Sequence, residues 1–337
     1  MGSEEKKLKL DLQVLLDKEE LWWKQRAKEE WLKFGDRNTK YYHACANSKR
    51  RQNYVGMIRD ERGQEWDTAE GVTEAFVHYF TRLFSKGPEG DLNPCIQPLE
   101  CCVSAAMNAE LVKPFLAEEI TTTLFQMGPL KAPGSNGLNE CFFQKNWSLM
   151  GKEVCDVVIE ILNSGFLPHD LNLTYIALIP KTQSLMNVTE FRPISLCNGL
   201  YKIISKVLAN HLKKILHLII SPTQSAFIPG HLISDNVLAA YEILHTMHIG
   251  MWEKKGFMPV KLDMSKVYDR VEWGFLEAVM RWMGFNERWI SLVLMCVKSV
   301  CYLILVNGNP CGFIVPSRGI RQGDPLSPYL SSFAQRR

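Results

Sequence analysis

The chain has 337 residues, a length that allows two domains or one large domain with an extension. Hydrophobic residues make up 46% of it and charged residues 22%, proportions that exclude a wholly disordered or a fibrous chain. The formal net charge is only +3, so any surface for nucleic acid must be a local one.

The ten cysteines form neither a CxxC pair nor a Cys/His cluster with the spacing of metal ligands. This pattern favours a reducing intracellular compartment, the nucleus or the cytoplasm, and residues 1–7 lack the apolar run of a signal peptide. The apolar stretch 289–306 is long enough for a membrane span, but Lys298 near its middle would cost roughly 2.5–3.5 kcal/mol there. We therefore predict a buried helix followed by a strand, and no membrane partner.

The first part of the chain is predicted to be mostly helical. Residues 1–50 combine mixed charge with aromatic side chains in a helical pattern, and residues 53–66 have the pattern of a small hairpin. Asp67 and Glu70 have the spacing of a capping box, which predicts that a helix begins there. Its apolar residues recur at helical intervals: Val72, Phe76, Phe80 and Leu83.

Residues 87–98 are rich in Gly, Pro and Asn and predict a linker, so we place a domain boundary between a helical extension, 1–98, and a second domain, 99–337. Beyond the linker, helices and strands alternate without a regular βαβ repeat, which predicts an α+β fold. Helices are expected over 118–127, 154–162, 200–220 and 237–248, strands over 175–179 and 260–263, and then two helices and a hairpin at 301–315 that turns at 307–310.

Asp263 stands at the end of a predicted strand, directly before a tight turn. A carboxylate in such a place can bind a hard divalent cation such as Mg²⁺ together with substrate phosphates. The alternative is a carboxylate that caps a turn or a helix, and spacing alone favours that alternative. Asp269, six residues further on, is expected to face Arg270 or a helix start.

The loop 318–328 is the second candidate site. Arg321 and Gln322 offer hydrogen-bond donors to a nucleotide or phosphate, and Gly323 permits close approach of the backbone. The alternative is a loop that caps a helix at Asp324, with Pro325 in its first turn.

Two cations near prolines form the third candidate. Lys181 follows Pro180, Arg192 precedes Pro193, and we expect stiff turns at both prolines from which the cations could reach triphosphate oxygens. The alternative is a pair of solvated charges in a connecting loop.

Together these features match one family in order and spacing. From about residue 115 to 330 the chain resembles the reverse transcriptases of LINE-type (non-LTR) retrotransposons, especially those of plants. Residues 31–43 resemble the segment that precedes the polymerase in the same elements. The matching stretches are 178–181, 191–196, 201–206, 224–230, 263–273 and 319–328.

The resemblance implies a right-hand polymerase, here its fingers and a partial palm, that copies an RNA template from a DNA primer with deoxynucleoside triphosphates. It implies Mg²⁺, with Mn²⁺ as the alternative ion, as cofactor, and Asp263 as the metal-binding aspartate. It also implies backbone contacts from Met264 and Ser265 to the triphosphate, and a steric gate against the ribose 2′-OH at Tyr268. Lys181 and Arg192 would be finger cations, and Gln322 would meet the nascent base pair.

The chain also departs from the family. The resemblance predicts paired aspartates and a thumb beyond Pro328, and neither is found in the sequence up to Arg337. Residues 331–337 fit a one-nucleotide frameshift. Asn136 and Val267 replace a common Asp and a common Ala. We therefore expect a truncated chain that does not extend a primer as it stands.

Two other functions stay open. The chain could be a non-catalytic remnant that at most binds nucleic acid, through the finger cations and Lys40, Lys49, Arg50 and Arg51. An unrelated metal-dependent transferase built on Asp263 fits the ordered motifs less well. For the polymerase we expect residues 257–263 and the hairpin 301–315 in one palm sheet, with Asp263 facing an open cleft near Gln322.

Overall fold

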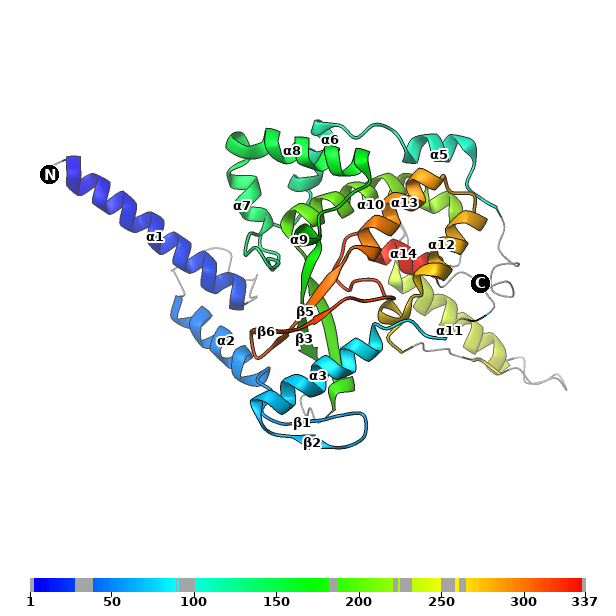
Figure 1. Ribbon diagram of the computed structural model, residues 1–337, viewed down its shortest axis with the longest axis horizontal. Coiled ribbons are helices and arrows are strands. Elements are labelled where there is room, and N and C mark those ends of the chain that lie inside the picture. The colour runs from blue at the N-terminus through cyan, green and yellow to red at the C-terminus, as the bar shows by residue number, and fades with distance from the viewer. Residues whose placement is uncertain are drawn as a thin grey trace.

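The computed structural model describes residues 3–27, 39–88, 90, 101–181, 187–220, 224, 232–249, 258–260 and 265–334. It confirms an α+β fold, in which a small sheet lies between one helix on one side and a larger group of helices on the other (Figure 1). No helix in the described ranges has the length and apolar character that a membrane crossing needs.

The N-terminal part begins with two helices that pack against each other, α1 (Ser3–Ala27) and α2 (Thr39–Gln52), and α1 points away from the rest of the molecule (Figure 1). The predicted hairpin is present as β1 (Ile58–Arg59) paired with β2 (Glu65–Trp66). Helix α3 (Ala69–Leu83) follows.

The predicted cap of α3 was one residue off. The N-cap is Thr68 and not Asp67, because the Thr68 hydroxyl accepts a hydrogen bond from the backbone N–H of Gly71 at 3.1 Å. A hydroxyl at the N-cap satisfies one of the free N–H groups of the first turn, as the carboxylate was expected to do.

The sheet has four strands in the order β4-β3-β5-β6. Strand β3 pairs antiparallel with β4 and parallel with β5, and β5 forms an antiparallel hairpin with β6. The strands are β3 (Leu173–Pro180), β4 (Phe191–Leu196), β5 (Cys301–Val306) and β6 (Asn309–Ile314).

The expected turn at Pro193 is wrong, because this proline lies inside β4 opposite Leu178. Strand β4 is at the edge of the sheet, where a residue without a backbone N–H need not break a ladder bond. The exposed Arg192 is therefore held on a strand and not in a connecting loop.

The predicted hairpin 301–315 is confirmed, but the strand expected beside it in the same sheet, over residues 257–263, is not. Its turn is formed by Asn307 and Gly308, whose φ angles of 51° and 89° are those of a tight two-residue turn. Strand β5 pairs with β3. Residues 258–260 lie in no strand, and 257 and 261–264 lie outside the described residues, so the palm strand that carries Asp263 stays a prediction.

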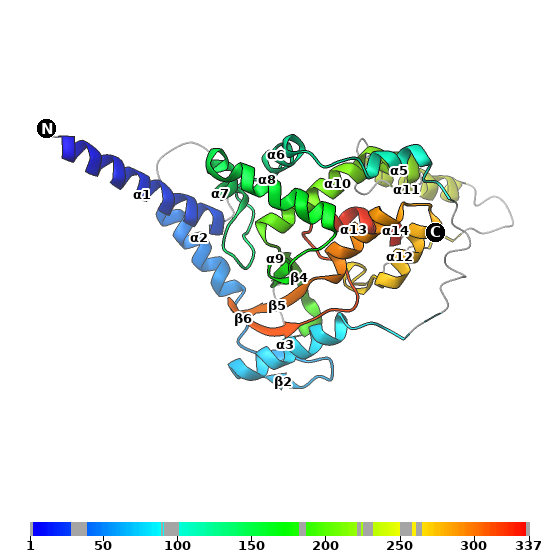
Figure 2. The same ribbon diagram turned by 45° about the horizontal axis from the view of Figure 1, so that its top comes forward.

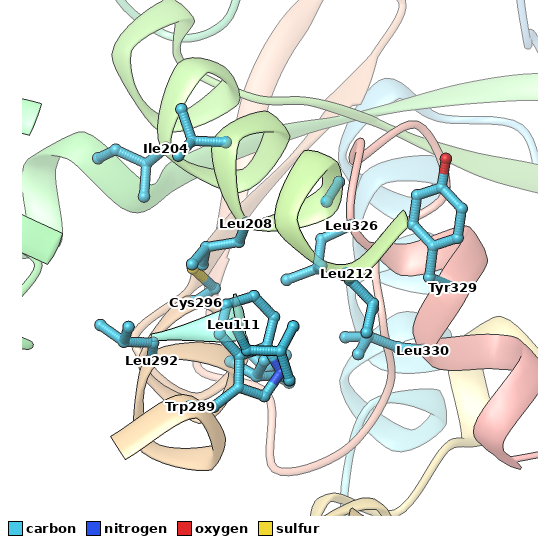
Figure 3. Close-up of a cluster of buried hydrophobic side chains, with 14 of the residues drawn as sticks. Leu111, Ile204, Leu208, Leu212, Trp289, Leu292, Cys296, Leu326, Tyr329 and Leu330 are labelled. Carbon is cyan, nitrogen blue, oxygen red and sulfur yellow. The ribbon is translucent and has the colours of Figure 1, made fainter. Parts of the chain in front are cut away.

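The larger group of helices is built around α10 (Gly199–Ile219), most of which is buried, as its apolar pattern predicted. Figure 3 shows Leu208 and Leu212 of α10 close to Trp289 and Leu292, with Leu330 beside them. Around α10 lie α5 (Ala105–Leu111), α6 (Ala117–Phe125), α7 (Glu140–Lys145), α8 (Trp147–Ser164), α9 (His169–Asn172), α12 (Trp273–Trp282), α13 (Glu287–Lys298) and α14 (Ser327–Ala334). Helix α11 (Ile233–Ile249) is exposed along nearly all of its described length.

Helix α3 shares a second core with the sheet. Phe76 and Phe80 are fully buried against Phe191, Tyr302 and Ile304 of β4 and β5. Figure 2 shows α3 along the sheet, with α8, α10 and α13 beyond the sheet from it. The part of the chain before the predicted linker therefore contributes directly to the packing of the sheet.

Candidate nucleotide-binding site

The loop that carries Gln322 is bound to the turn after Asp263 by backbone hydrogen bonds. The N–H of Gly319 donates to the carbonyl of Val271, and the N–H of Ile320 donates to that of Tyr268, both at 2.8 Å. Gly319 has a φ of +96°, and a Cβ there would lie 2.9 Å from the carbonyl oxygen of Asp269. The close approach of the two segments therefore requires glycine.

Gln322 lies between this turn and strand β4. Its backbone carbonyl accepts a hydrogen bond from the N–H of Ser195 at 2.8 Å. Its side-chain Nε2 donates to Oδ1 of Asp269 at 3.0 Å. The structure thus brings together the loop, the strand that carries Arg192, and the turn that follows Asp263 in the sequence.

Arg321 does not contribute to this site, contrary to the sequence prediction. Its guanidinium group is 4% exposed and forms an ion pair with Asp324 at 3.0 Å. It also donates to the side chain of Asn172 and stacks on the ring of Tyr201. Asp324 accepts from the N–H of Leu326 at 2.8 Å, but the helix begins only at Ser327, so Pro325 is not in its first turn, where the alternative placed it.

The two finger cations lie at one end of the β3–β4 pair. Lys181 follows β3, and Arg192 in β4 is opposite Ile179. Both side chains are exposed. The Nζ of Lys181 donates to the carbonyl of Thr189 at 3.4 Å, and its positive charge acts to lower the pKa of Asp269.

Asp269 faces Gln322 and not Arg270 or a helix start, which the sequence led us to expect. It is 2% exposed, and burial raises the pKa of its carboxyl group to about 6. The hydrogen bond from Gln322 and the positive charges of Lys266, Lys181 and Arg270 act in the opposite direction. Its second oxygen, Oδ2, has no hydrogen-bond partner among the described residues.

Lys266 links the same turn to α3. Its φ of 56° is left-handed, and its Nζ hydrogen-bonds to the hydroxyl of Tyr79 and lies 4.3 Å from the centre of that ring. Burial lowers the pKa of Lys266 to about 8. The sequence analysis missed Lys266 and Tyr79, because no local pattern relates residues 187 positions apart.

Two further predicted site residues, Ser265 and Tyr268, belong to the same turn. Ser265 is exposed, and Tyr268 is half-buried against the helical core, where its hydroxyl accepts from Ser331 of α14 at 3.3 Å. Asp263 and Met264 lie outside the described residues. The steric gate and the metal ligand therefore stay predictions.

Comparison with known proteins identifies the chemistry that such a site serves. Residues 179–335 match the family model of reverse transcriptases, RNA-dependent DNA polymerases. The Xenopus laevis transposon TX1 uncharacterized 149 kDa protein is 28% identical over 308 residues, 89% of this chain and 23% of that protein. The Drosophila melanogaster Pol polyprotein from the type-2 retrotransposable element R2DM is 29% identical over 170 residues, 50% of this chain and 16% of that protein. Residues 179–335 are a reverse transcriptase domain of the LINE type.

The chain also has a plant relative. The uncharacterized mitochondrial protein AtMg01250 of Arabidopsis thaliana is 62% identical over 35 residues, 10% of this chain and 29% of that protein. The chain spans less than a third of the length of each of these three relatives.

Reverse transcriptases of this family generally depend on a divalent metal ion. Among the residues whose placement is described, no group of three or more His, Cys, Asp or Glu side chains could hold one. We therefore assign no step of the reaction to a metal bound by the described residues.

Proposed function

We propose that the chain forms the fingers and part of the palm of an RNA-directed DNA polymerase that binds an RNA template, a DNA primer and deoxynucleoside triphosphates. The position of Gln322, hydrogen-bonded to both Ser195 of β4 and Asp269, is the observation that carries the proposal. This amide lies beside β4, the strand that carries Arg192, and Lys181 follows the paired strand β3, an arrangement that supports a site for a base and its triphosphate.

Each predicted residue has a role in this proposal. Lys181 and Arg192 bind the triphosphate, because guanidinium and ammonium groups pair with phosphate oxygens. Gln322 contacts the nascent base pair, and Tyr268 acts as a gate against a ribose 2′-OH. Asp263 would hold the divalent ion, Mg²⁺ with Mn²⁺ as a substitute, and the backbone of Met264 and Ser265 would contact the triphosphate. When bound, this ion neutralises charge on the transferred phosphoryl group.

Template-directed nucleotide binding tests the proposal without requiring catalysis. The full chain is bound to a fluorescent RNA–DNA hybrid whose primer ends in a dideoxynucleotide, and dissociation of the hybrid is followed in Mg²⁺. The next complementary dNTP should slow dissociation, whereas a mismatched dNTP should not. A chain that binds the hybrid without any response to dNTPs would be a nucleic-acid-binding remnant, and the polymerase proposal would be wrong.

The finger cations are tested in the same experiment. The variants Lys181→Ala and Arg192→Ala should each raise the dNTP concentration required by about 10-fold or more, because hydrogen bonds to charged groups contribute about 1.5–3 kcal/mol. Lys152→Ala is the matched control, since Lys152 is an exposed lysine on helix α8 and belongs to neither β3 nor β4. An equal effect of all three substitutions would contradict the assigned roles.

A further inference from the structure

We propose that Asp269 is a positioning residue, which fixes the orientation of the Gln322 side-chain amide toward the incoming nucleotide. This inference rests on the proposed function and adds a residue to which neither the sequence nor the family resemblance gave a role. Its basis is the contact between Asp269 Oδ1 and Gln322 Nε2 at 3.0 Å.

The backbone around Asp269 cannot easily shift. Its N–H donates to the carbonyl of Lys266 at 3.1 Å, and its carbonyl lies against Gly319, where a Cβ would come within 2.9 Å. The backbone carbonyl of the neighbouring Tyr268 accepts a hydrogen bond from the N–H of Ile320 at 2.8 Å. The carboxylate is therefore held at a fixed place beneath the Gln322 loop, almost fully buried.

A carboxylate determines which end of an amide faces it. An ionised carboxylate only accepts hydrogen bonds, whereas the Gln322 amide has a donor end, Nε2, and an acceptor end, Oε1. Nε2 must therefore face Asp269, and Oε1 must point to the other side. A ligand then meets a fixed acceptor and the second N–H of Nε2. An asparagine at position 269 could donate or accept and would leave both orientations possible.

Burying the carboxylate of Asp269 costs free energy that a single hydrogen bond to Gln322 does not require. Oδ2 of Asp269 has no partner within the described part of the chain, and a buried charged oxygen without a partner is destabilising. The neutral isostere asparagine could accept the same hydrogen bond from Gln322. Stability therefore does not explain why residue 269 is an aspartate. A group that can only accept hydrogen bonds, and so allows one orientation of the Gln322 amide, does explain it.

The surrounding charges favour the ionised form that this role needs. Lys266, Lys181 and Arg270 all favour the carboxylate over the protonated acid. Lys266 is itself held by Tyr79 of α3, through its amine and the face of the ring. The position of Asp269 thus depends on the α3 segment as well as on its own turn.

The test compares the full chain with Asp269→Asn in the dideoxy-terminated hybrid assay at pH 7.5. We expect Asp269→Asn to fold, with a melting temperature at least as high as that of the parent chain. We expect the slowing of hybrid dissociation by complementary dNTP to fall about 5- to 10-fold, the cost of a misoriented hydrogen-bonding group. Asp170→Asn, at an exposed position on α9, is the matched control and should change neither value.

A double-mutant cycle tests the contact itself through melting temperatures, without any nucleotide. Gln322→Glu should lower the melting temperature, because two carboxylates would face each other, and adding Asp269→Asn should restore it, because asparagine can donate to glutamate. Additive shifts in this cycle would overturn the contact. A full dNTP response in Asp269→Asn would overturn the positioning role alone, whereas no response in the parent chain would overturn the proposed function and the positioning role with it.

Discussion

At the scale of single residues, the polar side chains of the loop 318–328 divide into buried structural residues and partly exposed candidate site residues. Local sequence does not reveal which residue belongs to which group. Arg321 and Gln322 are neighbours, yet the first is buried in an ion pair with Asp324 and the second is partly exposed between β4 and Asp269. The partners of Arg321 come from separate elements, among them Asn172 and Tyr201. Sequence alone could therefore select the loop as a site but could not assign its individual residues.

Asp269 gives a prediction about stability and pH. Its pKa is raised from 3.8 to about 6, so the folded chain binds this proton more tightly than the unfolded chain does. The stabilisation from the protonated form is complete below about pH 4 and is lost as the pH rises to about 6, a change on the order of 3 kcal/mol. We therefore expect Asp269→Asn to stabilise the chain more at pH 7 than at pH 4.

Urea unfolding of the parent chain and of Asp269→Asn, from pH 4 to pH 7.5, measures this difference. Asp170→Asn should show no comparable trend over that range, because its carboxylate is exposed. A gain in stability that is the same at every pH would show that burial does not perturb Asp269.

At the scale of elements, local patterns predicted helices and the hairpin turn but not the pairing of strands. The helix at α10 follows from its apolar period, and the end of α8 follows from Gly165, whose φ of 70° is left-handed. The pairing of β3 with β5 joins residues more than a hundred positions apart, and no local signal specifies it. Pro193 predicted a turn in place of β4, because proline is unusual in a strand except at the edge of a sheet. That β4 is an edge strand follows only from the long-range pairing.

The hairpin turn also attaches the N-terminal part of the chain to the sheet. The Asn307 side chain accepts the N–H of Val55 at 2.9 Å and donates to the carbonyl of Val55 at 3.0 Å. We expect Asn307→Gly, which keeps the left-handed turn, to lose only these two bonds, about 1–3 kcal/mol of unfolding free energy. Asn307→Ala should lose about 1 kcal/mol more, because alanine is strained at this φ.

Urea denaturation at neutral pH measures both changes, and cleavage near the exposed Tyr54 by a protease specific for aromatic residues should become faster in both variants. Asn309→Ala, at the start of β6, is the control and should stay within about 0.5 kcal/mol of the parent chain. Equal stability of Asn307→Gly and the parent chain would show that the attachment contributes nothing.

At the scale of the whole molecule, two hydrophobic cores meet at the sheet. One lies around α10 and the other between α3 and the strands, and Lys266 contacts α3 whereas Gln322 contacts β4. The family and the site motifs were accessible from sequence, because short ordered motifs carry them. The contribution of α3 was not, because a contact between Tyr79 and Lys266 exists only in the folded chain.

Nucleic-acid binding by the whole chain should be sequence-independent and sensitive to salt. The net charge of +3 provides little long-range attraction, so contacts from local cations to phosphates should dominate. We expect the affinity for an RNA–DNA hybrid to fall steeply between about 50 and 200 mM salt, and to stay the same when the duplex sequence is changed. Salt-insensitive, sequence-specific binding in a fluorescence anisotropy titration would be inconsistent with this account.

The central claim is that the site reads a template base when it binds a nucleotide. The most direct measurement uses four dideoxy-terminated hybrids that differ only in the next template base, each titrated with all four dNTPs in Mg²⁺. We predict that for each template only the Watson–Crick partner slows dissociation of the hybrid, and that exchanging the template base exchanges the effective dNTP. The same response to every dNTP, or none to any, would contradict the assignment of this chain as the fingers and part of the palm of a template-directed polymerase.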